Sequence, residues 1–325
     1  MYEHLIKPLS AARSDREEKE SSGPENPQQK IRLNGREHLE GMNLTFSWSI
    51  HRSSGDRHAG LKPHIHPYPE CLYFTGLNTA NAKYLGAEIE IRLGEEQESY
   101  LFNDPTAVVI PAGLPHGPVM TRKLFSPRGF GFFTAGLSDE SNTRWIEPPN
   151  GRAVSDAPAR KYAHLIKPLR SGLTTERRQF VASRFTPEQL AAREKMTRRT
   201  GFKSGPGDTD HLIWMYGRDL ENLDINIAWG FSSSPGIWHR GMTAHAHPED
   251  EALIYLGTDP DNSDYLGAEI EIDLGKEHER YLFDKPTVVL CPAGLMHGPM
   301  VTRWVDRPFA FLLINLAGDM TMSFE

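Results

Sequence analysis

The chain is poor in cysteine. Only Cys71 and Cys291 occur among its 325 residues, and they do not occupy equivalent positions in the internal repeat described below. A framework of disulfides is therefore not expected, and a reducing cytoplasm is the predicted location. Long apolar runs are also missing, because no stretch approaches the roughly 20 residues of a membrane span. The first residues lack the basic-then-apolar pattern of a secretory signal.

Basic residues are not in excess. Lysine and arginine number 36 against 43 aspartates and glutamates, which gives a formal net charge of −7. This charge argues against nucleic acid or an anionic membrane surface as the main partner. We therefore expect a small molecule as the partner, and the sequence leaves a homo-oligomer open.

Histidine, by contrast, occurs in a repeated pattern. Six of the 14 histidines fall into two sets, and each set combines three histidines with one glutamate. Every member of the second set lies 181 residues after its counterpart, so the two sets superimpose without a gap. Two complete sets in register favour metal binding over histidines that merely belong to the core. The predicted metal ligands are His64, His66, Glu70 and His116 in the first set, and His245, His247, Glu251 and His297 in the second.

The repeat extends beyond these residues. The opening segment Tyr2–Leu9 returns as Tyr162–Leu169 with nearly the same sequence. The chain length is typical of about two domains, and the repeat makes that number concrete. We predict an N-terminal domain over residues 1–160 and a C-terminal domain over residues 161–325. Each opening segment is expected to form an extra edge strand on the neighbouring domain, with a flexible arm as the alternative.

Strand signals dominate both halves. In residues 43–50 and 224–231, large apolar side chains alternate with polar or small ones at period two. Short apolar runs elsewhere end at Pro-Ala-Gly. Many short strands separated by glycine and proline indicate an all-β antiparallel barrel or sandwich. Two segments differ from this pattern. Residues 11–30 are charged and polar like a solvated loop, and residues 186–199 have the end signals of a short helix.

The spacing of the predicted ligands suits a metal ion inside a barrel. Residues two apart on a strand point the same way, so His64 and His66 can share one face. A tight turn at Gly113 or Gly294 positions the last histidine of each set. Imidazole nitrogens and one carboxylate suit Fe(II), Mn(II), Ni(II), Cu(II) or Zn(II). Four protein ligands on an octahedral ion leave two positions for substrate, water or dioxygen, which indicates a reactive site.

These motifs resemble those of the cupin superfamily, in which an HxHxxxE segment precedes a later PxGxxH segment. Both copies match all four ligand positions, so the chain looks like a bicupin. The resemblance implies an all-β fold of two double-stranded β-helix (cupin jelly-roll) barrels with few short helices. It also implies one divalent transition metal per domain, held by the eight residues above. Pro105 and Pro286 stand where a glycine is expected before the second motif, and this departure leaves the subfamily open.

Five further residues are candidate catalytic groups. Arg122 and Arg303 follow the last histidine of each set by six residues, and the planar guanidinium of either can hold a substrate carboxylate. A surface charge is an equally good interpretation of both. Glu249 is a candidate general acid or base near the second ion, with a solvated acidic loop as the alternative. Tyr73 and Tyr255 are candidates to line the lumen, although aromatic residues in barrel strands usually belong to the core.

Two other patterns bear on the barrel interior. Residues 87–91 and 268–272 alternate isoleucine with glutamate, which places the isoleucines inside and the glutamates outside. The copies differ beside the ligand glutamate, where Tyr68 and Cys71 in the first half correspond to Glu249 and Ala252 in the second. Cys71 is interpreted as a small core residue rather than a redox thiol.

The leading functional hypothesis is a metalloenzyme that acts on a small organic substrate. By analogy with cupins, Fe(II) is the favoured ion and an Fe(II)-type dioxygenase the favoured activity. The alternative is redox-neutral chemistry, in which the ion acts as a Lewis acid during lysis, decarboxylation or isomerisation. A non-catalytic bicupin that binds a metal or a small molecule is the competing class, as a sensor, a storage protein or a sugar-binding module. The presence of all eight ligands counts against the storage type.

Overall fold

The chain forms two units, each with its own set of contacts. The computed structural model describes residues 1–9, 28–55, 62–81, 83–147, 160–169, 211–237, 244–262 and 264–324. Residues 11–169 form one unit, called the first barrel below. Residues 1–10 and 170–325 form the other, called the second barrel. The domain limits at residue 160 stay a prediction. The predicted helix over 186–199 lies outside the described residues, as do residues 11–27 of the predicted loop.

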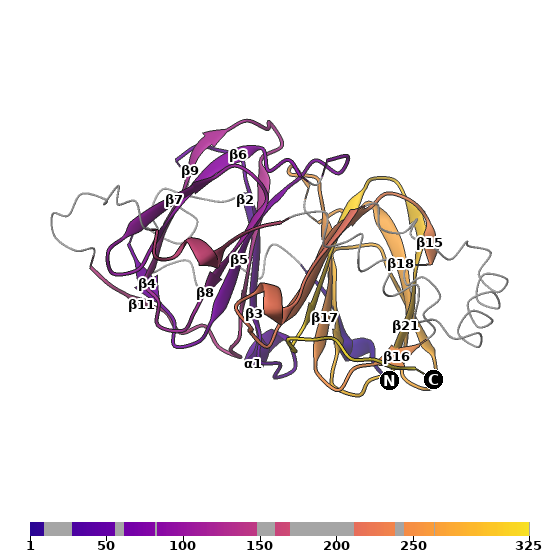
Figure 1. Ribbon diagram of the computed structural model, residues 1–325. Coiled ribbons are helices and arrows are strands. Elements are labelled where there is room, and N and C mark those ends of the chain that lie inside the picture. The colour runs from indigo at the N-terminus through magenta and orange to yellow at the C-terminus, as the bar shows by residue number, and fades with distance from the viewer. Residues whose placement is uncertain are drawn as a thin grey trace. The chain divides into compact units, whose positions relative to one another are not determined.

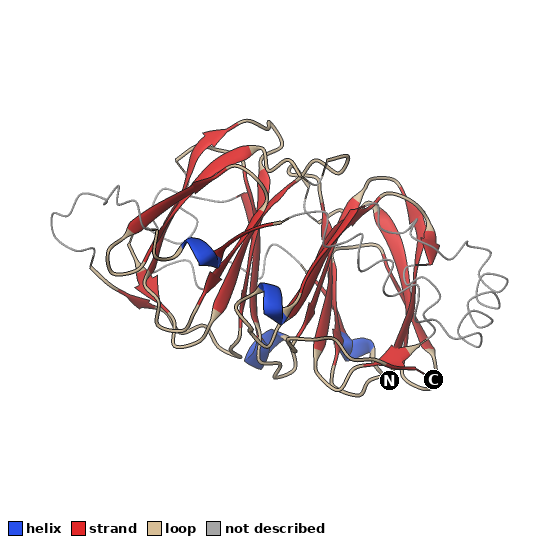
Figure 2. Ribbon diagram, in the orientation of Figure 1, coloured by secondary structure: helices blue, strands red, loops and turns tan. Residues whose placement is uncertain are grey.

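The first barrel consists of two antiparallel sheets (Figures 1 and 2). One sheet has the order β12 (Ile166–Pro168), β8 (Thr106–Ile110), β5 (Glu70–Gly76), β10 (Phe130–Gly136), β3 (Thr45–His51) and β2 (Gln28–Asn34). The other has the order β11 (Arg144–Trp145), β4 (His64–Ile65), β9 (His116–Leu124), β6 (Ala87–Leu93) and β7 (Glu98–Phe102).

The second barrel repeats this plan. Its first sheet has the order β1 (Ile6–Pro8), β20 (Thr287–Cys291), β17 (Glu251–Gly257), β22 (Phe309–Asn315), β14 (Asn226–Ser232) and β13 (His211–Met215). Its second sheet has the order β19 (Glu279–Phe283), β18 (Ala268–Leu274), β21 (His297–Val305), β16 (His245–Ala246) and β23 (Ser323–Phe324), and β15 (Gly236–Ile237) pairs with β21.

Helices are few and short in the part of the chain that the structure describes. The α-helix α1 covers Gly35–His38, and the 3-10 helices η1, η3 and η5 cover Glu3–Leu5, Ala163–Leu165 and Gly217–Asp219. None of these helices is long and apolar enough to cross a membrane. The predicted all-β fold with two jelly-roll barrels and few short helices is therefore confirmed.

The alternating strands bury their isoleucines as predicted. Ile89 and Ile91 on β6 are fully buried, as are Ile270 and Ile272 on β18. Burial of these side chains removes apolar surface from water and stabilises each barrel. On the opposite face of β6, Glu88 is partly exposed and forms an ion pair with Lys123. Glu90 and Glu271 are only 3% and 2% exposed, so the expectation of glutamates outside the barrel does not hold as exposure to solvent for these two.

Each opening segment forms an edge strand, and it pairs with a strand from the other half of the sequence. In the second barrel, Ile6 of β1 pairs with Val289 of β20. In the first barrel, Ile166 of β12 pairs with Val108 of β8. The edge-strand hypothesis is thus confirmed for both segments. Each pairing covers an open sheet edge, which would otherwise present unpaired backbone groups.

The unusual prolines lie next to these edge strands. The backbone N–H of Leu9 donates to the carbonyl of Pro286 at 2.7 Å, and that of Leu169 donates to the carbonyl of Pro105 at 2.7 Å. Proline fixes its own φ and lacks an N–H, but its carbonyl still accepts hydrogen bonds. The positions that depart from the cupin pattern therefore help to attach the opening segments.

Candidate metal centres

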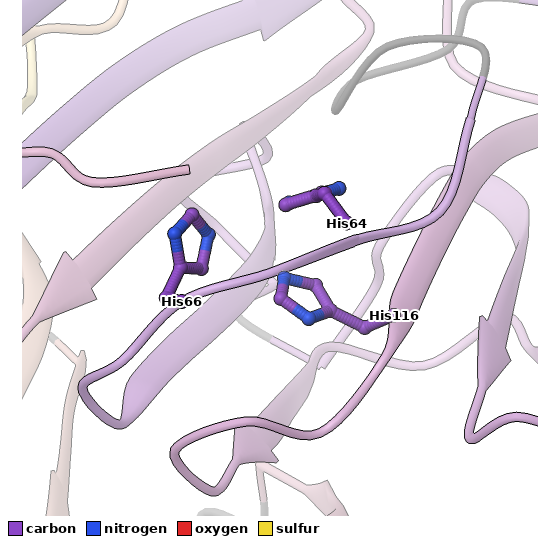
Figure 3. Close-up of side chains that lie close together, drawn as sticks. All are labelled: His64, His66 and His116. Carbon is purple, nitrogen blue, oxygen red and sulfur yellow. The ribbon is translucent and has the colours of Figure 1, made fainter. Parts of the chain in front are cut away.

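Three of the four predicted ligands of the first barrel, His64, His66 and His116, lie close together (Figure 3). His64 lies on β4, His66 follows it, and His116 begins β9 directly opposite His64. One ring nitrogen from each of the three imidazoles lies within 4.8 Å of the others, and all three residues are buried. Glu70 reaches this cluster from the facing sheet, where its Oε2 lies 3.6 Å from Nε2 of both His66 and His116.

The second set forms an equivalent cluster in the second barrel. His245, His247 and His297 bring their ligand atoms within 4.8 Å of one another. Glu251 Oε1 lies 3.5 Å from His247 Nε2, and Glu251 Oε2 lies 3.1 Å from His297 Nε2. This centre is the more enclosed of the two, because the Glu251 side chain is 1% exposed and the Glu70 side chain is 11% exposed.

A glycine turn ties the two motifs of each barrel together. Gly113 and Gly294 have φ angles of 76° and 79°, a region that suits glycine far better than other residues. The N–H of Gly113 donates to the carbonyl of His66 at 2.8 Å, and that of Gly294 donates to the carbonyl of His247 at 2.7 Å. The turn predicted from the sequence therefore fixes the HxH segment against the strand that carries the last histidine.

Backbone carbonyls set the tautomer of four imidazoles. The Nδ1 atoms lie at hydrogen-bond distance from a carbonyl oxygen, as follows: His66 to Asn142 at 3.1 Å, His116 to Leu114 at 2.9 Å, His247 to Thr321 at 2.7 Å and His297 to Leu295 at 3.0 Å. A carbonyl only accepts, so Nδ1 carries the proton and Nε2 keeps a lone pair. The buried Nε2 atoms of His116 and His297 have no hydrogen-bond partner among the described residues. A metal ion would satisfy both.

The first centre also favours neutral imidazoles, the form that binds metals. Burial lowers the pKa of His64 to about 2, and the neighbouring His116 and His66 add to this shift. Burial likewise lowers the pKa of His66. In the second centre, burial by itself lowers the pKa of His297, but Cys291 and Glu251 outweigh it and raise the pKa well above its ordinary value.

The residues beside the ligand glutamate differ between the barrels. Antiparallel register places side chains of directly opposed residues on the same face of a sheet. Glu70 lies opposite Ile110 and Gly136, on β8 and β10. The corresponding neighbours of Glu251 are Cys291 and Asn315, on β20 and β22. The ligand glutamate therefore has apolar or absent side chains beside it in the first barrel and polar ones in the second.

Two asparagines continue this polar row in the second barrel. Asn315 lies opposite Asn226 of β14, and both are fully buried. Asn226 Nδ2 donates to Asn315 Oδ1 at 3.1 Å and to the carbonyl of Ala317 at 3.0 Å, and its Oδ1 accepts from Trp214 Nε1 at 3.3 Å. Asn315 Nδ2 has no hydrogen-bond partner in the described structure. One amide donor is thus held in place beside Glu251.

The first barrel fills the same space with an aromatic ring. Tyr68 stacks on His66 with centroids 5.1 Å apart, and its hydroxyl accepts a hydrogen bond from the backbone N–H of Asn142. A Cβ atom on Gly136 would come within 2.8 Å of this ring and 2.5 Å of Thr45 Oγ1. A side chain like that of Asn315 therefore does not fit while Tyr68 is present.

Glu249 occupies in sequence the position of Tyr68, two residues after the second histidine. Its Oε2 is buried and has no hydrogen-bond partner among the described residues. The next residue differs in this respect, because Asp250 Oδ1 accepts from the backbone N–H of Ala293 at 2.8 Å. Glu249 as a whole is partly exposed, so its role as an acid or base and the alternative of a solvated acidic loop both stay predictions.

The two predicted arginines lie on carboxylates rather than beside the metal ligands. Arg122 forms an ion pair with Glu90, and Arg303 Nη1 lies 2.9 Å from Glu271 Oε2. Glu90 alternates with the buried Ile89 and Ile91, so this pairing takes place on the outer face of the sheet. The sequence places Glu271 in the same way on β18. The interpretation as surface charges describes this placement better than a substrate clamp does.

The two predicted tyrosines are not equivalent. Tyr73 lies on the face of β5 opposite Glu70 and stacks on Phe133 with centroids 4.5 Å apart. Tyr255 shares a face with Glu251, and its hydroxyl donates to Met300 Sδ at 2.8 Å. Burial raises the pKa of both well above the ordinary value. Tyr255 thus lines the lumen, whereas Tyr73 belongs to the apolar layer outside it.

Three residues near the second centre were not predicted as part of the site. They are Cys291, Asn226 and Asn315. Two of them could have been found by comparing the two halves of the sequence, because Asn226 replaces Thr45 and Cys291 replaces Ile110 at equivalent positions of the repeat. The match of Gly136 with Asn315 became visible only through the common register with the ligand glutamates.

These two clusters and the two jelly-roll barrels define the chain as having a bicupin fold. No protein-family model and no curated protein sequence matches it. Solved structures do. Two mutants of oxalate decarboxylase from Bacillus subtilis superpose with TM-scores of 0.57 and 0.56 at 11% identity, over 93% and 91% of this chain and 76% and 74% of theirs. A third structure, from work on the Mn(II) centres of the same enzyme, gives 0.51 at 12% identity over 92% of this chain and 76% of that one. At a sequence identity this low, structural similarity establishes the fold alone.

Proposed function

We propose that the chain is a metal-dependent enzyme that acts on a small carboxylate, with redox-neutral decarboxylation as the favoured reaction. The observation that carries this proposal is the pair of buried clusters, each with three imidazoles and one carboxylate around a common point. Sequence reasoning favoured an Fe(II) dioxygenase and kept decarboxylation as the alternative. The fold similarity to oxalate decarboxylases supports the alternative better than the favoured activity.

The donor set of each cluster fits a divalent transition metal. The three imidazoles are neutral, so the one carboxylate balances one of the two positive charges of the ion. The four protein ligands therefore leave one positive charge at each centre. With these four ligands alone, one substrate carboxylate bound to the ion would neutralise that charge inside a buried site. Mn(II) becomes the favoured ion, because a structural neighbour is described by its Mn(II) centres. When bound, the ion would act as a Lewis acid that polarises a substrate oxygen.

The second barrel offers groups that can orient and protonate such a substrate. Asn315 Nδ2 is a buried donor that would give its hydrogen bond to a substrate oxygen. Asn226 holds that amide in place through its own hydrogen bond to Asn315 Oδ1. Glu249 has a buried carboxylate oxygen available to carry a proton. The first barrel has Gly136 and Tyr68 at the corresponding positions, so we place the reaction in the second.

The proposed reaction balances without an oxidant. The bond between the carboxylate carbon and its neighbour breaks, and carbon dioxide leaves. The electron pair of that bond stays on the remaining carbon, which takes up one proton. With oxalate as substrate, the products are carbon dioxide and formate. Glu249 would supply the proton and recover it from solvent, which is the role of a general acid.

The test is turnover by protein loaded with Mn(II) or Fe(II) and offered oxalate and other small carboxylates. We expect carbon dioxide release without stoichiometric oxygen uptake, and formate from oxalate. Oxygen consumption that matches turnover would instead indicate an oxidative activity, with oxygen atoms in the product if it is a dioxygenase. Fully loaded protein without turnover would indicate a binding protein. The matched variants His64→Ala and His245→Ala then assign the activity to a barrel, and we expect only His245→Ala to abolish it.

A further inference from the structure

We propose that Cys291 is a fifth protein ligand of the second metal centre, which would then bind its ion through a thiolate in addition to three imidazoles and one carboxylate. The inference rests on the proposed function in one respect only, namely that the second barrel binds a metal ion.

Strand register brings the thiol to the metal side of the sheet. Cys291 is the last residue of β20 and lies directly opposite Glu251, the first residue of β17. Opposed residues on antiparallel strands have Cβ atoms about 4.5–5.5 Å apart on the same face. The Cys291 sulfur, a carboxylate oxygen of Glu251 and a ring nitrogen of His297 all lie within 4.8 Å of one another. Glu251 and His297 belong to the ligand set already described.

The separations suit ligands of one ion. Bonds from zinc to nitrogen and to sulfur of about 2.0–2.3 Å allow two ligand atoms to be up to roughly 4.4 Å apart. The 3.1 Å between His297 Nε2 and Glu251 Oε2 suits neighbouring ligands of one ion, and the bound of 4.8 Å on the Cys291 sulfur exceeds the widest ligand separation by only a few tenths of an ångström. Cys291 is 1% exposed. A metal ion at this point would take the place of the acidic protons on the ring and the thiol, because both groups bind metals in their deprotonated form.

The first barrel lacks this thiol. Ile110 lies opposite Glu70 in the place of Cys291. Its cysteine, Cys71, follows Glu70 on β5, so its side chain points to the other face of the sheet. Cys71 and Tyr73 share that face, and burial raises the pKa of the Cys71 thiol to about 12. The two centres would therefore differ in chemical character, one with nitrogen and oxygen ligands alone and one that includes sulfur.

Ligation by Cys291 has a defined chemical consequence. The thiol gives up its proton as the sulfur–metal bond forms, so loading of the second centre releases one proton that loading of the first does not. A thiolate favours softer ions such as zinc, so the second centre would prefer them more strongly than the first. Five protein ligands on an octahedral ion leave one position for a substrate oxygen in the second barrel, against two in the first.

The experiment is the electronic spectrum of the full chain loaded with Co(II), supported by X-ray absorption of the Zn(II) form. We expect a near-ultraviolet charge-transfer band from thiolate to cobalt, and sulfur at about 2.3 Å from zinc. The variant C291S should lose both signals, and C71S should keep both. The variant I110C places a thiol at the equivalent position of the first barrel and should increase the band.

Each other outcome overturns a defined claim. A protein that binds cobalt in both barrels but shows no band, or a band that persists in C291S, contradicts ligation by Cys291 and leaves the proposed function standing. A protein that binds no cobalt in the second barrel contradicts both. Because serine is nearly isosteric with cysteine, circular dichroism of C291S and its cobalt content at the first centre show whether a lost band reflects lost structure.

Discussion

Asn315 on β22 lies directly opposite the ligand residue Glu251 on β17, and its Nδ2 is buried without a hydrogen-bond partner in the described structure. Burial of an amide donor without a partner costs free energy, which the fold tolerates only if a ligand or water provides an acceptor. In the first barrel the same position is Gly136, and Tyr68 fills the space. The polar row of the second barrel is thus the main difference between two otherwise equivalent sites.

The first prediction concerns Asn315. Replacing Asn315 with Ala removes the donor and leaves the metal ligands intact. A hydrogen bond to a charged group contributes about 1.5–3 kcal/mol, so kcat/KM should fall roughly 10- to 100-fold. Steady-state kinetics of the Mn(II)-loaded variant measure this effect, with metal content as the control. Unchanged kinetics would show that the amide does not contact the substrate.

The second prediction concerns the proton donor. Glu249→Gln keeps the shape of the side chain but cannot transfer a proton, so kcat should fall about 10²- to 10⁴-fold, the usual contribution of a general acid. Metal content should stay the same. Tyr68→Phe is the matched change in the first barrel and should have little effect on turnover. Equal losses in the two variants would argue against a specific role for Glu249.

The third prediction concerns the edge strands. Leu5 and Leu165 are 4% and 2% exposed, next to β1 and β12. Removing a buried leucine side chain costs about 2–5 kcal/mol. Leu5→Ala should therefore destabilise the second barrel and Leu165→Ala the first. Hydrogen exchange measured separately for the peptides of each barrel tests this assignment. Faster exchange in the first barrel for Leu5→Ala, or in the second for Leu165→Ala, would contradict it.

The fourth prediction concerns pH and the outer carboxylate Glu90. Burial alone raises its pKa, but hydrogen bonds from Arg122, Ser99 and Arg92 outweigh burial and hold the pKa below the ordinary value of 4.5. The unfolded chain therefore binds a proton at Glu90 more readily than the folded one. This contribution to stability is present above pH 4.5 and is lost as the pH falls through the lowered pKa.

Denaturant unfolding of the metal-free protein between neutral pH and pH 3 measures this dependence. Glu90→Gln should be less stable than the parent chain at neutral pH, and the difference between the two should shrink below pH 4.5. A difference that stays constant across this range would show that the ion pair with Arg122 does not contribute through its charge.

Much of the fold and the metal site could be predicted from sequence, because the information is local or repeated. His64 and His66 share a short segment, and the second copy in register confirmed the pattern. The edge strands were recognisable because Tyr2–Leu9 returns almost unchanged as Tyr162–Leu169. Period two alternation was enough to place the isoleucines of β6 and β18 inside the barrels.

What could not be predicted depends on pairing between distant strands. The register between β6 and β9 shifts between Glu88 and Ile89 and again between Ile91 and Leu93. Counting six residues from His116 therefore does not show which face Arg122 occupies. Tyr73 and Tyr255 differ by one position in the repeat, and one position moves a side chain to the opposite face. The neighbours of Glu251 likewise follow from the register of β17 with β20 and β22.

Crystals of the metal-loaded protein, measured at the absorption edge of the bound ion, test the central claim most directly. We predict two anomalous peaks per chain. One should lie about 2.0–2.3 Å from the donor atoms of His64, His66, His116 and Glu70, and the other at the same distance from those of His245, His247, His297 and Glu251. Peaks only at the protein surface, or no peak in either barrel at full metal loading, would contradict it.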